Sequence, residues 1–199
     1  MARPREFDEA TVLDAAAGCF WSRGYEATSV RDLIEKTGIT GASLYNAFGD
    51  KRTLYQKALD HYVEDSIANR IRRCEQLPPR RAIGVFFEEI LSRSLYDPEH
   101  RGCMLVNAAL DVAPHDPDLQ QVVAAMLTRI ETFFRRTVEA GQADGTITRS
   151  LTAETLGQHL LGVLMGVRVL ARVRPEKALL EGVIAPALAL LDRRPASEA

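Results

Sequence analysis

The sequence predicts an all-helical protein, and three observations support this. Across 199 residues, apolar side chains recur mainly at spacings of three and four, the period of an amphipathic helix. No convincing run of β-branched residues alternates with polar ones, as strands would require. Turn-forming pairs such as Pro78-Pro79 and Asp144-Gly145 separate the periodic segments. We therefore expect about nine helices, with neither repeats nor low-complexity tracts.

The first helix is predicted to begin at Glu6 or Asp8 and to end near Ser22. Its inward side is apolar, because small and aromatic residues recur there at helical spacing: Val12, Ala15, Ala16, Cys19 and Phe20. Arg3 and Arg5 precede it, either as a disordered arm or as an arm that reaches a minor groove.

Residues 28 to 51 are predicted to form two short helices joined by a tight turn. Ser29 is a predicted N-cap, and Asp32 three residues later completes a variant of the capping box. Gly38 ends this helix, because glycine takes a left-handed conformation without steric cost. Thr40 is the predicted N-cap of the second helix.

The second of these helices has two different sides. Leu44 and Phe48 lie one turn apart and face the first helix of the pair. The other side carries small or hydrogen-bonding residues, namely Thr40, Gly41, Ser43, Tyr45 and Asn46. Such a pair of helices is typical of the helix-turn-helix, whose second helix enters the DNA major groove.

The N-terminal 55 residues resemble the TetR family of bacterial transcriptional regulators. The resemblance rests on a set of residues that is specific in combination: Ala16, Phe20, Gly24-Tyr25, Thr28-Ser29, Ile34, Gly38-Ile39-Thr40, Leu44-Tyr45 and Phe48-Gly49-Asp50-Lys51. Many relatives carry a basic residue at the position of Gly41 and a histidine at that of Asn46 or Ala47. The docking mode on double-stranded DNA is therefore expected to carry over, and the operator sequence is not.

The residues expected to contact DNA combine backbone-binding and base-reading groups. Asn46 suits bidentate contact with adenine, while Tyr45 and Lys51 suit phosphates. The full predicted set is Ser29, Arg31, Thr40, Gly41, Ser43, Tyr45, Asn46 and Lys51. An ordinary helical hairpin without nucleic acid is the alternative.

The remaining helices follow from caps and breaks. One is predicted from Lys51, capped by Asp50, to about Cys74. Asp116 with Pro117 suits the start of another long helix. The other predicted segments are 80–95, 102–112, 117–143, 152–173 and 175–191, with Pro186 expected to bend the last.

The last two helices carry small residues that permit close helix approach. Either they pack within the chain, or they form the four-helix dimer interface that the family resemblance implies. The predicted interface residues are Gly157, Leu161, Leu164, Gly182, Ala185 and Ala189. Gly162 and Gly166 share one face of the first of these helices. We expect a homodimer, whose two-fold symmetry would require a near-palindromic operator.

The resemblance also implies a small-molecule effector bound among the middle helices. The candidate residues are Phe86, Phe87, Ile90, Cys103, Asn107, Met126, Phe133 and His159, each of which could equally be plain core. Met104, Leu110 and Ile130 are further candidates. Cys103 at a helix start is either a reactive thiol or an inert buried one.

Composition limits the other possibilities. A net charge of −2 argues against a protein that coats nucleic acid non-specifically. The apolar runs are interrupted by Arg168 and Glu181, so no membrane span is expected. Three unpaired cysteines suit a reducing cytoplasm, and no signal peptide is visible. A metal set of His100, Cys103, His115 and Asp116 matches no zinc spacing, and no catalytic motif or cofactor is expected.

These observations predict a DNA-binding domain over residues 1–50, a ligand-binding and dimerisation domain over 51–192, and a flexible tail over 193–199. The expected function is a ligand-responsive transcriptional regulator, a homodimeric repressor released from its operator by a small molecule. The alternative is a helical small-molecule-binding protein or an enzyme that retains the first domain only as a scaffold.

Overall fold

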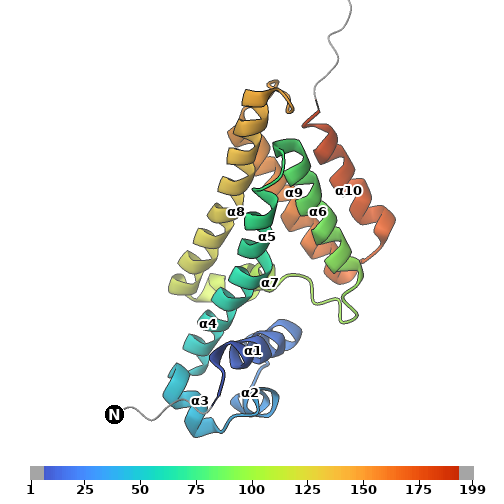
Figure 1. Ribbon diagram of the computed structural model, residues 1–199. Coiled ribbons are helices and arrows are strands. Elements are labelled where there is room, and N and C mark those ends of the chain that lie inside the picture. The colour runs from blue at the N-terminus through green and yellow to red at the C-terminus, as the bar shows by residue number, and fades with distance from the viewer. Residues whose placement is uncertain (1–6, 193–199) are drawn as a thin grey trace, which may run out of the picture. The chain divides into compact units, whose positions relative to one another are not determined.

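The computed structural model describes residues 7–192, which form helices and turns without a strand (Figure 1). The α-helices are α1 Glu9–Arg23, α2 Val30–Thr37, α3 Gly41–Phe48, α4 Lys51–Val63, α5 Asn69–Cys74, α6 Pro79–Leu95, α7 Met104–Asp111, α8 Pro117–Asp144, α9 Ala153–Val173 and α10 Lys177–Ala189. A π-helix, Glu64–Ala68, joins α4 to α5 without a break. Within the described residues this makes nine helical segments, as predicted.

Three predicted boundaries need correction. The helix expected over 51–74 is interrupted by the π-helix, a local change of register that residue periodicity does not reveal. The helix expected from Gly102 begins at Met104, because Gly102 has a φ of 73° and Cys103 is an extended N-cap. The last helix begins at Lys177, although Pro186 does lie within it.

The chain folds into two compact units. Of the described residues, the first unit comprises 7–67 and 103–121, and the second comprises 68–102 and 122–192. The first unit therefore extends beyond residue 50, because α4 packs along α1 and also touches α7. The tail expected over 193–199 lies outside the described residues.

The core of the first unit joins α1, α2, α3 and α4. Leu33, Leu44 and Leu54 are fully buried in it. Tyr55 lies at the centre of an aromatic group, with its ring centroid 5.0 Å from that of Phe20 and 4.9 Å from that of Tyr25. These ring contacts hold α1 and the loop that follows it against α4.

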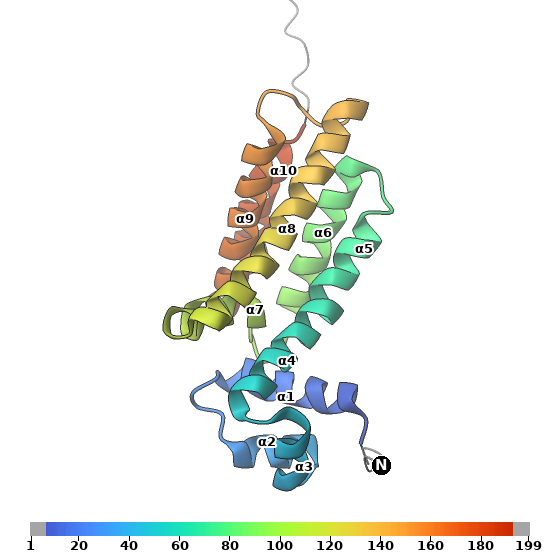
Figure 2. The ribbon, with the colours of Figure 1, turned by 90° about the vertical axis from the view of Figure 1, so that its left-hand side faces the viewer.

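The core of the second unit is an aromatic cluster between α6 and α8. The ring centroid of Phe86 lies 5.4 Å from that of Phe133 and 5.0 Å from that of Phe134. Phe87 stacks on Phe134 at 5.8 Å. Both ribbon views place α6 beside α9 and α10, and those three helices pack against one another (Figures 1 and 2).

Helix α9 is long and apolar enough to cross a membrane by length and composition alone. Its packing indicates a core helix instead. It packs on α6 and α10, and its Arg168 is buried and donates to the Ser94 hydroxyl at 2.8 Å and to the Gly102 carbonyl. A buried arginine bonded to neighbouring segments belongs to a protein interior rather than to lipid.

Candidate nucleic-acid interface

Helix α2 is held at its start by a reciprocal cap. The Ser29 hydroxyl accepts from the Asp32 backbone N–H at 3.2 Å, and the Ser29 N–H donates to the Asp32 carboxylate at 2.8 Å. Hydrogen bonds from Ser29, followed by one from Arg23, lower the pKa of Asp32 to about 2. The predicted capping box is confirmed. Ser29, proposed for DNA contact, therefore also has a structural role.

The turn between α2 and α3 depends on glycine at position 38. Gly38 has a φ of 71° and donates its N–H to the Ile34 carbonyl at 3.0 Å, which closes α2. A side chain at this position would be strained, because residues other than glycine rarely adopt a left-handed conformation. The chain can then reverse and begin α3 two residues later.

Helix α3 presents one buried side and one exposed side. Thr40 caps it by accepting from the Ser43 N–H at 3.2 Å, while Leu44 and Phe48 are buried. Tyr45 is 47% exposed and Asn46 is also exposed. Both ribbon views show α3 beside α2, as a helix-turn-helix requires (Figures 1 and 2).

Gly41 acts in packing between the two helices. A Cβ at this position would lie 3.1 Å from the Cδ1 atom of Ile34 on α2, so that the isoleucine side chain would have to shift by a few tenths of an ångström. The glycine therefore allows α3 to approach α2 closely. Many relatives carry a basic residue at this position.

Lys51 begins α4, whose N-cap Asp50 accepts from the Thr53 N–H at 2.7 Å. The Lys51 ammonium lies 4.4 Å from the centre of the Tyr25 ring and 3.5 Å from the Glu26 carbonyl oxygen. Tyr25 thus holds this cation beside the N-terminus of α4, where phosphate is also favoured. In the sequence, Tyr25 is indicated only by the Gly24-Tyr25 pair of the family resemblance.

Two arginines near the helix-turn-helix are paired with carboxylates. Arg23 forms an ion pair with Asp32. Arg52 binds Asp116 through two hydrogen bonds of 2.6 and 2.8 Å, and these hold the pKa of the Asp116 carboxyl well below its usual range. Arg52 also reaches Asp118 at 2.9 Å. Sequence reasoning missed this pair, because its members are 64 residues apart. The exposed Arg31 remains a candidate for phosphate contact, while Arg3 and Arg5 lie outside the described residues.

The predicted dimer residues fall into two groups. Gly182, Ala185 and Ala189 are exposed on α10, and Leu161 is half-buried on α9. Gly157 and Leu164 are corrections to that prediction. A Cβ at Gly157 would lie 3.1 Å from the Arg135 backbone on α8, and Leu164 is buried in the core, so both serve contacts within the chain.

The predicted effector residues are divided between the two units. Phe86, Phe87, Ile90 and Phe133 are buried core in the second unit, where Met126 is half-buried and His159 is exposed on α9. Cys103 and Asn107 belong to the first unit. Cys103 is buried, with the Tyr62 hydroxyl 3.6 Å from its sulfur. Within residues 7–192, no three His, Cys, Asp or Glu side chains lie close enough together to hold a metal ion.

Two short helices joined by a glycine turn, with a polar exposed side on the second, define a helix-turn-helix DNA-binding protein. The chain belongs to the TetR family. Residues 12–58 match the family model described as bacterial regulatory proteins, tetR family, and residues 79–186 match the tetracyclin repressor-like C-terminal domain. The protein is thus a transcriptional regulator, not an enzyme.

Individual relatives match along nearly the whole chain. The uncharacterized HTH-type transcriptional regulator YezE of Bacillus subtilis (strain 168) is 31% identical over 198 residues, 96% of this chain and 100% of the relative. The HTH-type transcriptional repressor ComR of Escherichia coli (strain K12) is 28% identical, covering 85% of this chain and 82% of ComR. A cysteine mutant of the TetR family regulator CifR, solved with 26-bp double-strand operator DNA, is 32% identical with a TM-score of 0.84, covering 96% of this chain and 100% of that one.

Proposed function

We propose that this protein is a homodimeric transcriptional repressor that binds a near-palindromic operator and is released by a small molecule. The exposed polar side of α3 is the observation that carries the DNA-binding part of the proposal. The relative CifR, solved on operator DNA, supports the same docking mode. Residues 1–50 would bind DNA and residues 51–192 would bind the effector and the partner subunit. As a bacterial transcription regulator, it would act in the cytoplasm.

The geometry of α3 suits contact with base edges. Its eight residues include none with a charge, so the helix would read sequence through hydrogen bonds and apolar contacts. Asn46 would pair with adenine, and Thr40, Gly41, Ser43 and Tyr45 would lie along the groove. Ser29, Arg31 and Lys51 would bind the flanking phosphates and fix the register.

The proposed dimer uses the exposed small residues of α9 and α10. On α9, Gly162, Gly166, Val169 and Val173 lie at spacings of four, three and four, and Val173 is 70% exposed. On α10, Gly182, Ala185 and Ala189 continue this surface, which we call the small-residue stripe. Within residues 7–192, no neighbouring segment comes within 4 Å of a Cβ built at Gly162, Gly166 or Gly182, so a partner helix can approach closely.

Symmetry explains why a dimer matters for binding. A two-fold axis repeats the same surface on both subunits and places two recognition helices about 34–36 Å apart, one turn of DNA. An effector that binds better to a conformation without this spacing would weaken operator binding. Each tenfold loss requires about 1.4 kcal/mol of differential affinity.

The test is a mobility-shift titration with the DNA upstream of the protein's own gene and a scrambled site. Lys51→Ala is expected to weaken binding to both DNAs alike and to lower the salt slope by about one, because one phosphate contact is lost. Asn46→Ala is expected to cost about 1–3 kcal/mol on the matched site only.

Arg81→Gln is the matched control, because it removes an exposed cation on α6 that pairs with Glu88. It is expected to leave both affinities unchanged. If the Lys51→Ala and Asn46→Ala variants both bound DNA with the affinity of the wild type, the assignment of this surface would be contradicted. A monomer in sedimentation equilibrium at concentrations where the operator is bound would contradict the dimer.

A further inference from the structure

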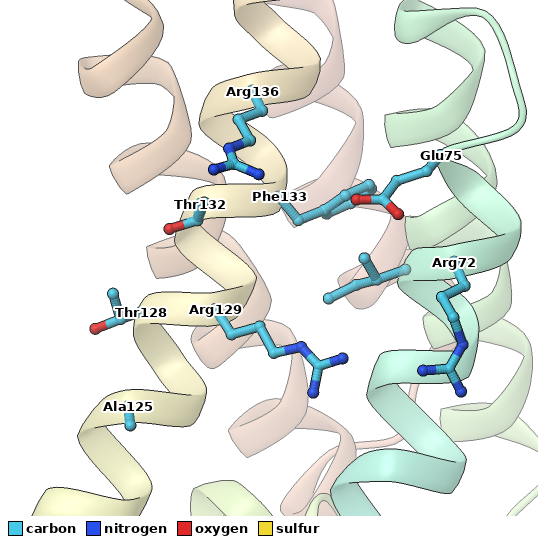
Figure 3. A pocket seen from close by; sticks show the side chains of 9 residues that line it. Arg72, Glu75, Ala125, Thr128, Arg129, Thr132, Phe133 and Arg136 are labelled. Carbon is cyan, nitrogen blue, oxygen red and sulfur yellow. The ribbon is translucent and has the colours of Figure 1, made fainter.

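The second unit contains a groove between α5 and α8, and Phe133 is the one predicted effector residue among those that line it. It has a volume of about 400 Å³, and two sides of different chemistry line it (Figure 3). Ile71 and Phe133 form its apolar floor, and both are buried. Arg72, Arg129 and Arg136 line its rim together with a single carboxylate, that of Glu75.

The arginines approach the groove from opposite walls. Arg129 and Arg136 are seven residues apart on α8, which places them on the same face two turns apart, about 10 Å along the helix axis. Arg72 extends from α5 on the other wall (Figure 3). A ligand between the helices would therefore meet guanidinium groups on both sides.

The residues that line the groove carry more positive than negative charge. Three guanidinium groups carry +3 and the Glu75 carboxylate carries −1, which leaves +2 among the lining residues. The neighbouring arginines of α5 lie elsewhere, because Arg70 and Arg73 both bind Glu89 at 3.0 and 2.7 Å. Arg72 also donates to the side chain of Asn69.

The floor is suited to an apolar group. Phe133 belongs to the rigid aromatic cluster with Phe86 and Phe134, and its edge lines the groove between the two helices (Figure 3). Ile71 supplies an aliphatic surface opposite. Small-molecule sites usually combine such a floor with a few polar groups, in a volume of about 300–1,000 Å³.

We propose that this groove binds an amphipathic organic anion, one carboxylate or phosphate group on an apolar body. The anionic group would bind between the arginines of α8 and Arg72, because guanidinium groups bind carboxylates and phosphates through paired hydrogen bonds. The apolar body would lie on Ile71 and Phe133. That this anion is the effector releasing the operator rests on the proposed function. Its binding to the groove does not.

The direct test is isothermal titration calorimetry of the full-length protein with octanoate and octyl phosphate. We expect both to bind at one site per chain. The controls are 1-octanol, octylammonium and inorganic phosphate, which lack the charge, invert it or lack the apolar body. Each is expected to bind at least about tenfold more weakly, because it loses one of the two interactions.

Three substitutions locate the site. Arg129→Gln and Arg136→Gln are each expected to weaken binding of octyl phosphate by about tenfold, because one charge-assisted hydrogen bond is lost. Glu75→Gln is expected to strengthen it several-fold, since it removes the one negative charge of the rim. Arg81→Gln, which removes a surface charge on α6 outside the groove, is the matched control and should bind as the wild type does.

The substituted variants are expected to fold, so a change in their affinity reports on the groove. Arg129, Arg136 and Glu75 are exposed, so their substitutions should leave the thermal unfolding midpoint unchanged. The proposal would be overturned if octylammonium or octanol bound as tightly as octanoate. It would also be overturned if the Arg129→Gln Arg136→Gln double variant bound octyl phosphate with the affinity of the wild type.

The two proposals fail in different ways. If octyl phosphate binds the groove but never releases the operator, the groove is a site without the effector role, and that part of the inference is overturned. If the wild-type protein binds no operator, the proposed function fails while the calorimetric result stands. Release of operator by octyl phosphate in the wild type, lost in the Arg129→Gln Arg136→Gln double variant, would support both.

Discussion

The two proposed binding surfaces of this protein differ in how they use charge. Helix α3 carries no charged residue over its eight positions, and the cations near it lie on flanking segments. The groove between α5 and α8 has three arginines around an apolar floor. DNA presents the same phosphates in every sequence, so the cations beside α3 would add affinity without discrimination, and the neutral side chains of α3 would read the base edges. A small anion offers one charged group, so concentrating arginines around it provides the main polar recognition.

The two surfaces also differ in what supports them. Helices α2 and α3 are short and held by local devices, namely the Ser29 cap, the Gly38 turn and the Thr40 cap. The groove depends on segments that are far apart in the chain, because α5 packs on α6, and the Phe86 ring of α6 packs on Phe133 and Phe134 of α8. Local devices make the first surface predictable from sequence, while the second exists only after long-range packing.

The largest expected effect comes from the buried side of α3. Leu44→Ala should lower the free energy of unfolding by about 2–5 kcal/mol, because Leu44 is fully buried and its truncation leaves a cavity. Urea denaturation followed by circular dichroism measures this. Asn46→Ala, on the exposed side, is the control and should change stability by less than about 0.5 kcal/mol. Equal losses in the two variants would mean that α3 has no distinct buried and exposed sides.

A substitution that adds a charge to α3 tests whether its neutral side chains provide the discrimination between DNA sequences. Asn46→Lys should weaken binding to the matched site, because it removes the proposed adenine contact, while the added cation should strengthen binding to mismatched DNA and increase the salt slope. The ratio of matched to mismatched affinity should therefore fall. Fluorescence anisotropy at several salt concentrations measures both quantities. A higher ratio of matched to mismatched affinity would contradict the idea that neutral residues on α3 provide the discrimination.

The close approach of α2 and α3 predicts a coupling between Gly41 and Ile34. Gly41→Ala places a Cβ 3.1 Å from the Ile34 Cδ1 atom, and Ile34→Val removes that atom. The alanine should therefore be better tolerated in the valine background, with a coupling of about 0.5 kcal/mol or more in a double-mutant cycle. If the two changes in unfolding free energy simply added, the contact between position 41 and the Ile34 Cδ1 atom would not determine how well alanine is tolerated.

The smallest effect concerns pH. The pKa of Asp32 is lowered from 3.8 to about 2 in the folded protein, by Ser29 first and then by Arg23. A lowered pKa means that the ionised cap stabilises the fold above about pH 4, and that this contribution is lost as the pH falls towards 2. The stability difference between wild type and Asp32→Asn should thus shrink from pH 6 to pH 3 in urea titrations. A difference that grows over this interval would contradict the cap.

The sequence alone determined the helix-turn-helix, because its information is local. Ser29, Gly38 and Thr40 act on backbone groups within a few residues, and Leu44 and Phe48 share a face through helical spacing. The all-helical class followed for the same reason, since a period of three to four residues is visible without any tertiary contact. Local rules could not reveal the π-helix at Glu64–Ala68, whose register change leaves no distinct periodicity.

Only the tertiary structure decided which apolar residues face a cavity and which fill the core. Phe86, Phe87 and Phe133 have the same apolar character, and long-range packing of α6 on α8 buries all three. Of these, Phe133 also lines the groove between α5 and α8. The tertiary structure also places Gly157 against Arg135, whereas no described segment lies within 4 Å of a Cβ built at Gly162. It likewise brings Arg52 to Asp116. Residue type and spacing define which face of a helix is apolar, but the partner of that face depends on segments distant in the chain.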